Sequence, residues 1–231
     1  MATLVTSLAR LTSSAVAALV LVWALAFPSS FTSSHSNQIY SVLHPLLMVI
    51  GLIIISGEAI MAHQSLSRFS RRSRKSVHLG LQGTAFGLGV FGIWAKFRGK
   101  DGIVANFYSL HSWMGLLCLS LFAAQWVVGF VNFFDRIESR RARATVLPWH
   151  VFVGLYTYVL AVVTAQTGLL EKLTFLHARR AGESARSTES MIVNGLGLGL
   201  ALLCGLVILA AVLPKKVTYE TTQKDHKLMQ Y

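Results

Sequence analysis

The sequence predicts an all-α membrane protein built from six transmembrane helices. Of its 231 residues, 54% are hydrophobic and only 13% are charged, about half of the ~25% that is usual for soluble domains. Six apolar stretches approach the ~20 residues that a spanning helix needs. They lie near residues 11–27, 42–63, 77–95, 109–131, 149–170 and 191–213. We therefore expect one transmembrane domain over residues 1–231, with residues 214–231 as a cytosolic tail.

The charge balance predicts how the chain is oriented in the membrane. The 21 Lys and Arg residues outnumber the 9 Asp and Glu residues, which gives a net charge of +12. Such an excess would indicate nucleic acid in a soluble protein. Here the cations lie between the spans, so the positive-inside rule explains them, and we expect no nucleic-acid partner. The N-terminus, the 66–77 and 134–147 connections and the tail are the richer set, so both termini are predicted to be cytosolic.

The first span also has features of a signal peptide. Arg10 is followed by an apolar run and by the small-residue triplet Ala24-Leu25-Ala26, a pattern that fits a cleavage site. We expect that the span is retained as a helix. Its removal would leave the orientation of the other five spans unchanged.

Four of the eight histidines occupy the same place in four consecutive spans. They lie at the starts of spans two to five, as His44, His78, His111 and His150. Because neighbouring spans run in opposite directions, His44 and His111 are predicted near the outer face and the other two near the cytosolic face. An imidazole in a membrane tends to face the bundle interior, where it finds a partner, and a helix N-terminus disfavours its protonation.

Paired neutral histidines from facing helices are the axial ligands that a b-type haem requires. The sequence therefore predicts two haem sites, one per leaflet, in a four-helix core formed by spans two to five. The competing interpretation is that each histidine hydrogen-bonds a carbonyl or a lipid group at the interface. That interpretation explains one such histidine better than it explains four in matching places.

Basic residues gather beside the two cytosolic histidines. Arg72, Arg74 and Lys75 precede His78, and three arginines precede His150, namely Arg140, Arg141 and Arg143. These cations would stabilise an anionic reductant or the haem propionates. Alternatively, they only set orientation and bind anionic lipid. On the outer side, a small acceptor could bind beside His111, among Lys96, Arg98, Asn106, Tyr108 and Ser109. Glu58 is predicted to pair with a loop arginine or, alternatively, to carry a proton.

Two other function classes remain open from the residues alone. A metal or proton transporter without haem would use the same histidines as a relay. It would also need ionisable groups at mid-membrane depth, where this sequence is apolar. A membrane subunit that only receives electrons from a protein partner is the second alternative.

Several motifs resemble the cytochrome b561 family. The most specific is Asn106-Phe-Tyr-Ser-Leu-His-Ser-Trp-Met-Gly115 in span four. It is accompanied by His44-Pro-Leu-Leu-Met-Val-Ile-Gly51, Gly57-Glu-Ala59 and Pro148-Trp-His150. The likeness extends over all six spans and is greatest to plant members of the family.

This resemblance implies a homodimer whose six-helix protomers each hold two haem b groups. It implies that electrons pass from cytosolic ascorbate to monodehydroascorbate or a ferric chelate on the far side, with no catalytic residue separate from the haems. By position, His44 and His111 would bind the non-cytosolic haem iron, and His78 and His150 the cytosolic one. The implied ascorbate site is Arg74, Lys75, Arg140, Arg141 and Arg143, and the implied acceptor site is Phe97, Arg98, Asn106 and Tyr108.

The sequence departs from the animal members of that family at the end of span two. Those members have an Ala-Leu-Leu-Val-Tyr-Arg stretch whose arginine grips ascorbate, whereas this chain reads Ala59-Ile-Met-Ala-His-Gln64. Another basic residue is therefore expected to take that role. The resemblance is compatible with a vacuolar, vesicle or plasma membrane.

Overall fold

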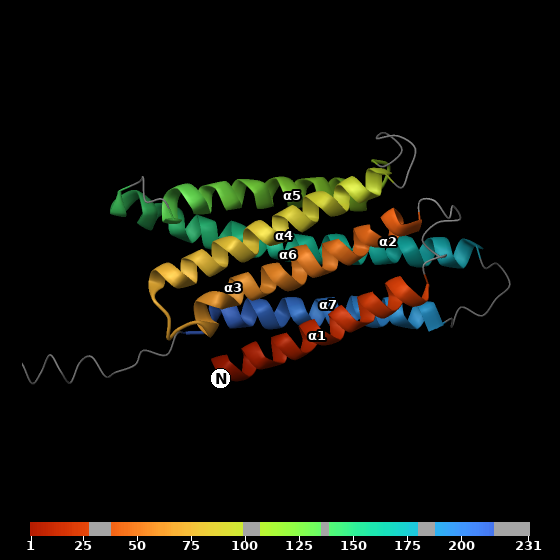
Figure 1. Cartoon of the computed structure of the whole chain (residues 1–231), viewed down its shortest axis with the longest axis horizontal. Helices are drawn as coiled ribbons and strands as arrows, with labels where there is room; N and C mark the ends of the chain where they lie inside the picture. The colour runs from red at the N-terminus through yellow and green to blue at the C-terminus, as the bar shows by residue number, and fades with distance from the viewer. Residues whose placement is uncertain (28–37, 99–106, 135–138, 180–187, 215–231) are drawn as a thin grey trace, which may run out of the picture.

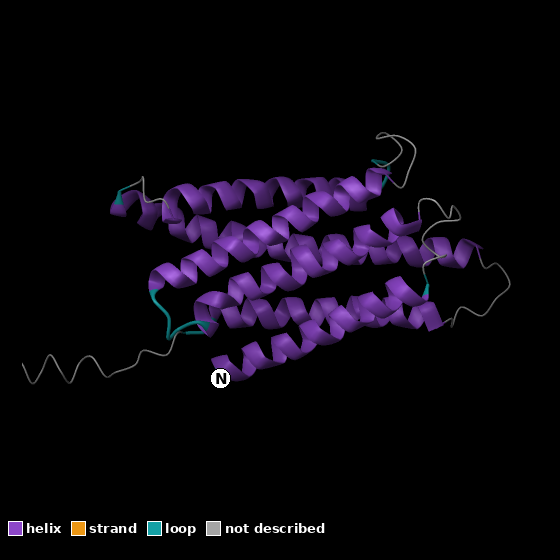
Figure 2. Ribbon diagram, in the orientation of Figure 1, coloured by secondary structure: helices purple, strands orange, loops and turns teal. Residues whose placement is uncertain are grey.

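The computed structural model describes residues 1–27, 38–98, 107–134, 139–179 and 188–214. Within these residues every regular element is a helix, and no strand occurs (Figure 2). The prediction of an all-α protein is therefore confirmed.

Within the described residues the helices form six long rods, which lie side by side (Figure 1). They are α1 (Ala2–Ala26), α2 (Gln38–Leu47) continued by η3 (Met48–Ile55) and α3 (Ser56–Ser65), α4 (Arg71–Arg98), α5 (Leu110–Gly129) continued by η5 (Phe130–Phe134), α6 (Arg140–Arg179) and α7 (Thr188–Val212). Among the described residues, all of these rods except α4 are long and apolar enough to cross a membrane. Helix α4 has 28 residues and begins with a run of cations.

A four-helix core and an outer helix pair make up the bundle. Helix α4 packs against the α2–η3–α3 rod and against α5, and α5 packs against α6. Helices α1 and α7 pack closely together beside this core, with Val16, Val20, Leu196 and Leu200 fully buried between them. The start of α1 and the end of α7 lie at the same end of the bundle (Figure 1).

The second rod is irregular because of its sequence. Pro45 lies inside α2, where it lacks the N–H that would hydrogen-bond the preceding turn. The eight-residue π-helix η3 follows, and its wider turns shift the register of α3 relative to α2. A Cβ on Gly51 would lie 2.8 Å from the Cβ of Leu88, so glycine is needed where η3 approaches α4.

Three of the four histidines do not lie at helix starts, which corrects the sequence-based prediction. Helices α2, α4 and α6 begin at Gln38, Arg71 and Arg140, well before their histidines. They do so because each helix extends beyond its apolar stretch; α6 even runs through Pro148. Only His111 lies in a first turn, which Ser109 caps by accepting a hydrogen bond from Ser112 N. The macrodipole argument for a neutral ring therefore does not apply to His44, His78 or His150.

Candidate functional site

One histidine pair lies at the bundle end where α5 begins. His44 of α2 and His111 of α5 face each other with their ring centroids 6.1 Å apart. His44 Nδ1 is 3.0 Å from the carbonyl oxygen of Gly92 in α4. His111 Nδ1 is 2.8 Å from the carbonyl oxygen of Thr164 in α6. All four rods of the core thus contribute to this pair.

The second histidine pair lies toward the opposite end of the same core. The rings of His78 in α4 and His150 in α6 have centroids 6.5 Å apart. His78 Nδ1 is 2.8 Å from the carbonyl oxygen of Ala59 in α3. His150 Nδ1 is buried and has no hydrogen-bond partner among the described residues.

The two pairs occupy separate levels of the core. On α4, His78 is followed fourteen residues later by Gly92, whose carbonyl accepts from His44. On α6, the same interval separates His150 from Thr164, whose carbonyl accepts from His111. Fourteen helical residues rise about 21 Å. The core therefore carries one pair near each end, separated by most of an apolar layer about 30 Å thick.

The histidine pairs fit a haem held by two axial ligands. A neutral ring whose Nδ1 donates to a carbonyl keeps its lone pair on Nε2, the nitrogen left for a metal. Two metal–nitrogen bonds of about 2 Å, plus the roughly 1.1 Å from each nitrogen to its ring centre, place the centroids about 6 Å apart. The observed separations of 6.1 Å and 6.5 Å agree with this distance.

Two glycines that sequence reasoning missed lie directly against these rings. A Cβ on Gly168 would stand 2.8 Å from His111 Cε1, and a Cβ on Gly129 would stand 3.1 Å from His150 Cε1. A side chain at residue 168 would displace the His111 ring, so this geometry requires glycine there. A side chain at residue 129 would press on the His150 ring, which would have to give by a few tenths of an ångström. Nothing in the sequence distinguishes these glycines from those that only let membrane helices pack.

Two cations flank the His78–His150 pair in matching ways. The His63 ring lies 5.0 Å from the His78 ring, and Arg74 Nη1 donates to the His63 carbonyl at 3.3 Å. The Phe133 ring lies 5.2 Å from the His150 ring, and Lys75 Nζ donates to the Phe133 carbonyl at 3.1 Å. Each cation is thus fixed to the backbone of a residue whose ring covers one histidine.

The other predicted cytosolic residues are more exposed. Arg140 and Arg141 are exposed in the first turn of α6, and Arg143 is half-buried. Gln64, which stands where animal members have arginine, is directed to another helix. Its Nε2 donates to the carbonyls of Ala210 at 2.6 Å and Leu213 at 2.9 Å, so it caps α7.

Three of the predicted acceptor residues, Phe97, Arg98 and Tyr108, lie at the end that holds His44 and His111. Arg98 places its guanidinium 5.7 Å from the centre of the Trp94 ring, and Phe97 contacts Phe107 with ring centroids 5.9 Å apart. Tyr108 donates a 2.5 Å hydrogen bond to Glu171. Burial and this hydrogen bond raise the pKa of Tyr108 to about 12, so its phenol is protonated at neutral pH. Asn106 lies outside the described residues.

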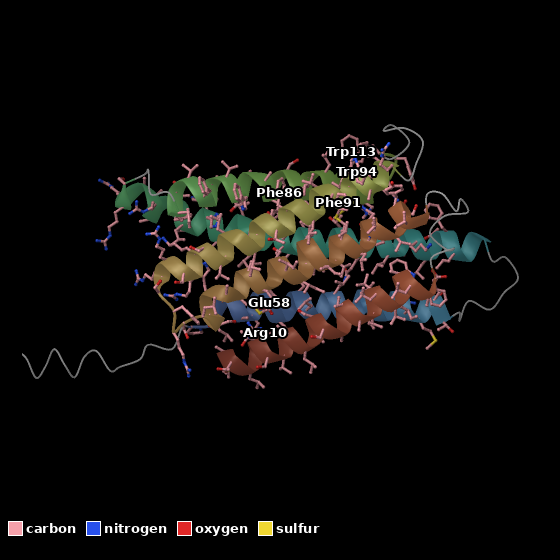
Figure 3. All side chains as sticks on the ribbon, in the orientation of Figure 1. Arg10, Glu58, Phe86, Phe91, Trp94 and Trp113 are labelled. Carbon is pink, nitrogen blue, oxygen red and sulfur yellow. The ribbon has the colours of Figure 1, made fainter. Side chains whose placement is uncertain are left out.

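Glu58 forms an ion pair, but with a helix residue rather than a loop arginine. Both of its carboxylate oxygens accept hydrogen bonds from Arg10 of α1, at 3.1–3.3 Å. The two side chains meet on the side of the bundle, away from the helix ends (Figure 3). This pair joins the outer helix pair to the core.

Comparisons with known proteins agree with this architecture. The sequence model of the family described as eukaryotic cytochrome b561 matches residues 43–176. The probable transmembrane ascorbate ferrireductase 4 of Arabidopsis thaliana is 59% identical over 221 residues, which cover 96% of this chain and 89% of the relative. The ascorbate-specific transmembrane electron transporter 2 of Zea mays is 42% identical, covering 88% and 86%. A transmembrane ascorbate-dependent reductase of Ovis aries is 38% identical, covering 72% and 66%.

A helical bundle with several spans and two facing histidine pairs defines the class of multi-pass membrane cytochromes. Within that class, the chain belongs to the eukaryotic cytochrome b561 family. It is accordingly an integral membrane oxidoreductase, and its family binds haem b.

Proposed function

We propose that this chain transfers electrons across a membrane from cytosolic ascorbate to a non-cytosolic acceptor, either monodehydroascorbate or a ferric chelate. Two haem b groups per protomer would carry the electrons. The observation that carries this proposal is the histidine pair near each end of one four-helix core. The names of the relatives, which include ascorbate ferrireductases and ascorbate-specific electron transporters, support the donor.

Four histidines would hold the haems in this proposal. His44 and His111 would bind the non-cytosolic haem, and His78 and His150 the cytosolic one. Bound haem supplies one-electron chemistry. The protein fixes the rings, through carbonyl bonds to three of the Nδ1 atoms, and surrounds them with apolar helices that keep out water.

The donor would bind at the cytosolic end, beside Arg74 and Lys75. Ascorbate is an anion at neutral pH, and half-buried cations attract it more strongly than exposed ones do. Arg74 Nε is buried without a hydrogen-bond partner among the described residues, which favours an anion there. Ascorbate would lose one electron to the protein and one proton to cytosolic water, and would leave as monodehydroascorbate. Arg140, Arg141 and Arg143 would raise its local concentration.

The acceptor would bind at the opposite end, near Phe97, Arg98, Asn106 and Tyr108. Monodehydroascorbate and many ferric chelates are anions, and the Arg98 guanidinium provides a fixed positive charge for them. The protonated Tyr108 phenol is held by Glu171 at the same end.

We further propose a homodimer in a vacuolar, vesicle or plasma membrane, with both termini in the cytosol and lipid around the bundle. The described cations at the starts of α4 and α6 outnumber those at their ends, as the positive-inside rule requires for this orientation.

Transfer across a sealed membrane tests the proposal. The purified protein would be placed in liposomes that enclose ferric citrate and a ferrous-specific dye, and ascorbate would be added outside. Dye colour should develop only in liposomes that contain the protein. A contrary result is that ascorbate reduces the protein while neither enclosed ferric citrate nor enclosed monodehydroascorbate is reduced. That result would contradict transmembrane transfer.

A further inference from the structure

A fifth histidine contacts the cytosolic histidine pair. The ring of His63 lies 5.0 Å from that of His78, tilted by 40°. His63 belongs to the last turn of α3 and is half-buried. Its ring therefore packs on a proposed haem ligand and also reaches the cytosolic end of the bundle.

The backbone around His63 is fixed from two directions. Arg74 in the first turn of α4 donates to the His63 carbonyl at 3.3 Å. The next residue, Gln64, donates to two carbonyls at the end of α7. Because two other helices hold residues 63 and 64, the place of the His63 ring beside His78 is set by the fold.

Comparison with the opposite side of the pair shows what is particular to His63. The Phe133 ring covers His150 much as the His63 ring covers His78. Lys75 donates to the Phe133 carbonyl, and Arg74 donates to the His63 carbonyl. Of these two rings, the His63 ring is the one that carries nitrogen atoms able to hydrogen-bond a ligand. The polar ring and the half-buried Arg74 lie on the same side of the pair.

We propose that His63 positions the electron donor. A ring nitrogen of His63 hydrogen-bonds an oxygen of bound ascorbate, while the face of the ring contacts His78. Arg74 then supplies the positive charge, and the hydrogen bond from His63 fixes the orientation of the bound ligand. Together they select a small acid rich in hydroxyl groups. This inference rests on the proposed function, because it assigns a residue to the same donor site.

Two substitutions separate hydrogen bonding from packing. His63→Phe keeps a ring of similar size and removes the nitrogens, whereas His63→Gln keeps an N–H donor and removes the ring. Loss of one hydrogen bond to a charged ligand should weaken ascorbate binding about tenfold. We expect this loss in His63→Phe, with both haems retained, and affinity within about twofold of the native protein in His63→Gln. The control Phe86→Leu, whose ring stacks on Phe122 and has no ring contact with either histidine pair among the described residues, should also stay within about twofold.

The readout is equilibrium binding of radiolabelled ascorbate to the dithionite-reduced holoprotein, which cannot turn over, together with haem content and the KM for ascorbate. Unchanged binding by His63→Phe would overturn the proposal. Equal weakening in His63→Phe and His63→Gln would also overturn it, because the ring would then serve packing. The proposal would also be overturned if His63→Phe lost the cytosolic haem while His63→Gln kept it.

The native protein separates this inference from the proposed function. If ascorbate does not reduce the native protein, the proposed donor is wrong and the role of His63 fails with it. If ascorbate reduces the native protein and His63→Phe binds ascorbate equally well, only the role of His63 is wrong.

Discussion

At the residue scale, backbone carbonyls and close neighbours orient the four histidine rings. The carbonyls of Gly92, Ala59 and Thr164 fix three rings through Nδ1, which leaves Nε2 as the metal-binding atom. The His150 ring is held by contacts with Gly129 and Phe133 instead. If His78 and His150 hold a haem as proposed, its binding should depend strongly on packing around His150.

Removal of one ligand tests the assignment of each haem. In His78→Ala or His150→Ala we expect haem content to fall from two per protomer to one, and reduction by ascorbate to be lost. In His44→Ala the remaining haem should still be reduced by ascorbate, because the donor site is intact. Haem assay and difference spectra measure both effects. A His78→Ala or His150→Ala variant that keeps two haems per protomer would contradict the assignment.

Substitution of Gly168 tests the packing of His111. In Gly168→Ala the new methyl group would stand 2.8 Å from His111 Cε1, and the Thr164 carbonyl prevents the ring from simply moving away. We expect a substantial loss of the non-cytosolic haem. Gly195→Ala is the matched control, since its Cβ would have no heavy atom within 4 Å. Equal haem content in the two variants would show that Gly168 is not required.

Sequence reasoning anticipated part of this site. Alternation of span direction alone predicts that His44 meets His111 and that His78 meets His150, and the structure brings these rings together. Their role as haem ligands stays a prediction. The contacts of Gly129, Gly168 and His63 could not be predicted in this way, because they depend on how each helix is rotated and tilted about its axis.

At the scale of the elements, the starts of α4 and α6 place charge near His78 and His150. Arg74 and Lys75 are fixed by backbone carbonyls, whereas Arg140 and Arg141 are exposed. An exposed cation is screened by salt more strongly than a half-buried one. The sequence groups these cations together, but only the structure separates fixed from exposed ones.

The combined variant Lys75→Ala and Arg141→Ala tests the role of these charges. We expect the KM for ascorbate to rise several-fold with both haems retained, and most of the increase to come from Lys75→Ala alone. The part due to Arg141 should disappear at high salt, because its charge is exposed. Steady-state kinetics at two ionic strengths measure this. Unchanged kinetics would show that the cations serve membrane topology only.

The Arg10–Glu58 pair tests how α1 is attached to the core. Arg10→Met removes the partner of Glu58 and should lower the free energy of unfolding by about 1.5 kcal/mol, the low end for charged hydrogen bonds, because the Arg10 side chain is 53% exposed. Thermal unfolding in detergent measures this change. The double variant Arg10→Met with Glu58→Gln should recover most of the loss, since no charge is then left unpaired. Additive losses in the double variant would contradict this interpretation.

Helix positions were easier to predict than helix ends. Apolar stretches locate the rods because a lipid-spanning helix must be apolar, but α4 and α6 continue as helices into charged sequence beyond those stretches. Helix α6 begins at Arg140 and runs through Pro148, a residue type that is over-represented in the first turn of helices. The π-helix η3 could not be predicted either, because its residues are almost all apolar and show no helical periodicity.

At the scale of the whole molecule, the account depends on two histidine levels in one core. Composition is sufficient to predict an all-α membrane fold, and the order of the spans is sufficient to predict the four-helix core. The intervals from His78 to Gly92 and from His150 to Thr164 then place the two levels about 21 Å apart along the helices. That separation suits electron transfer from one membrane face to the other.

The most direct test is an absorption spectrum of the detergent-purified protein, recorded oxidised, then with ascorbate, then with dithionite, alongside a haem assay. The account predicts two haem b groups per protomer with bis-histidine spectra, of which ascorbate reduces the larger part. A folded protein without colour would contradict the account, and a histidine-based metal or proton transporter would then explain the two histidine pairs better.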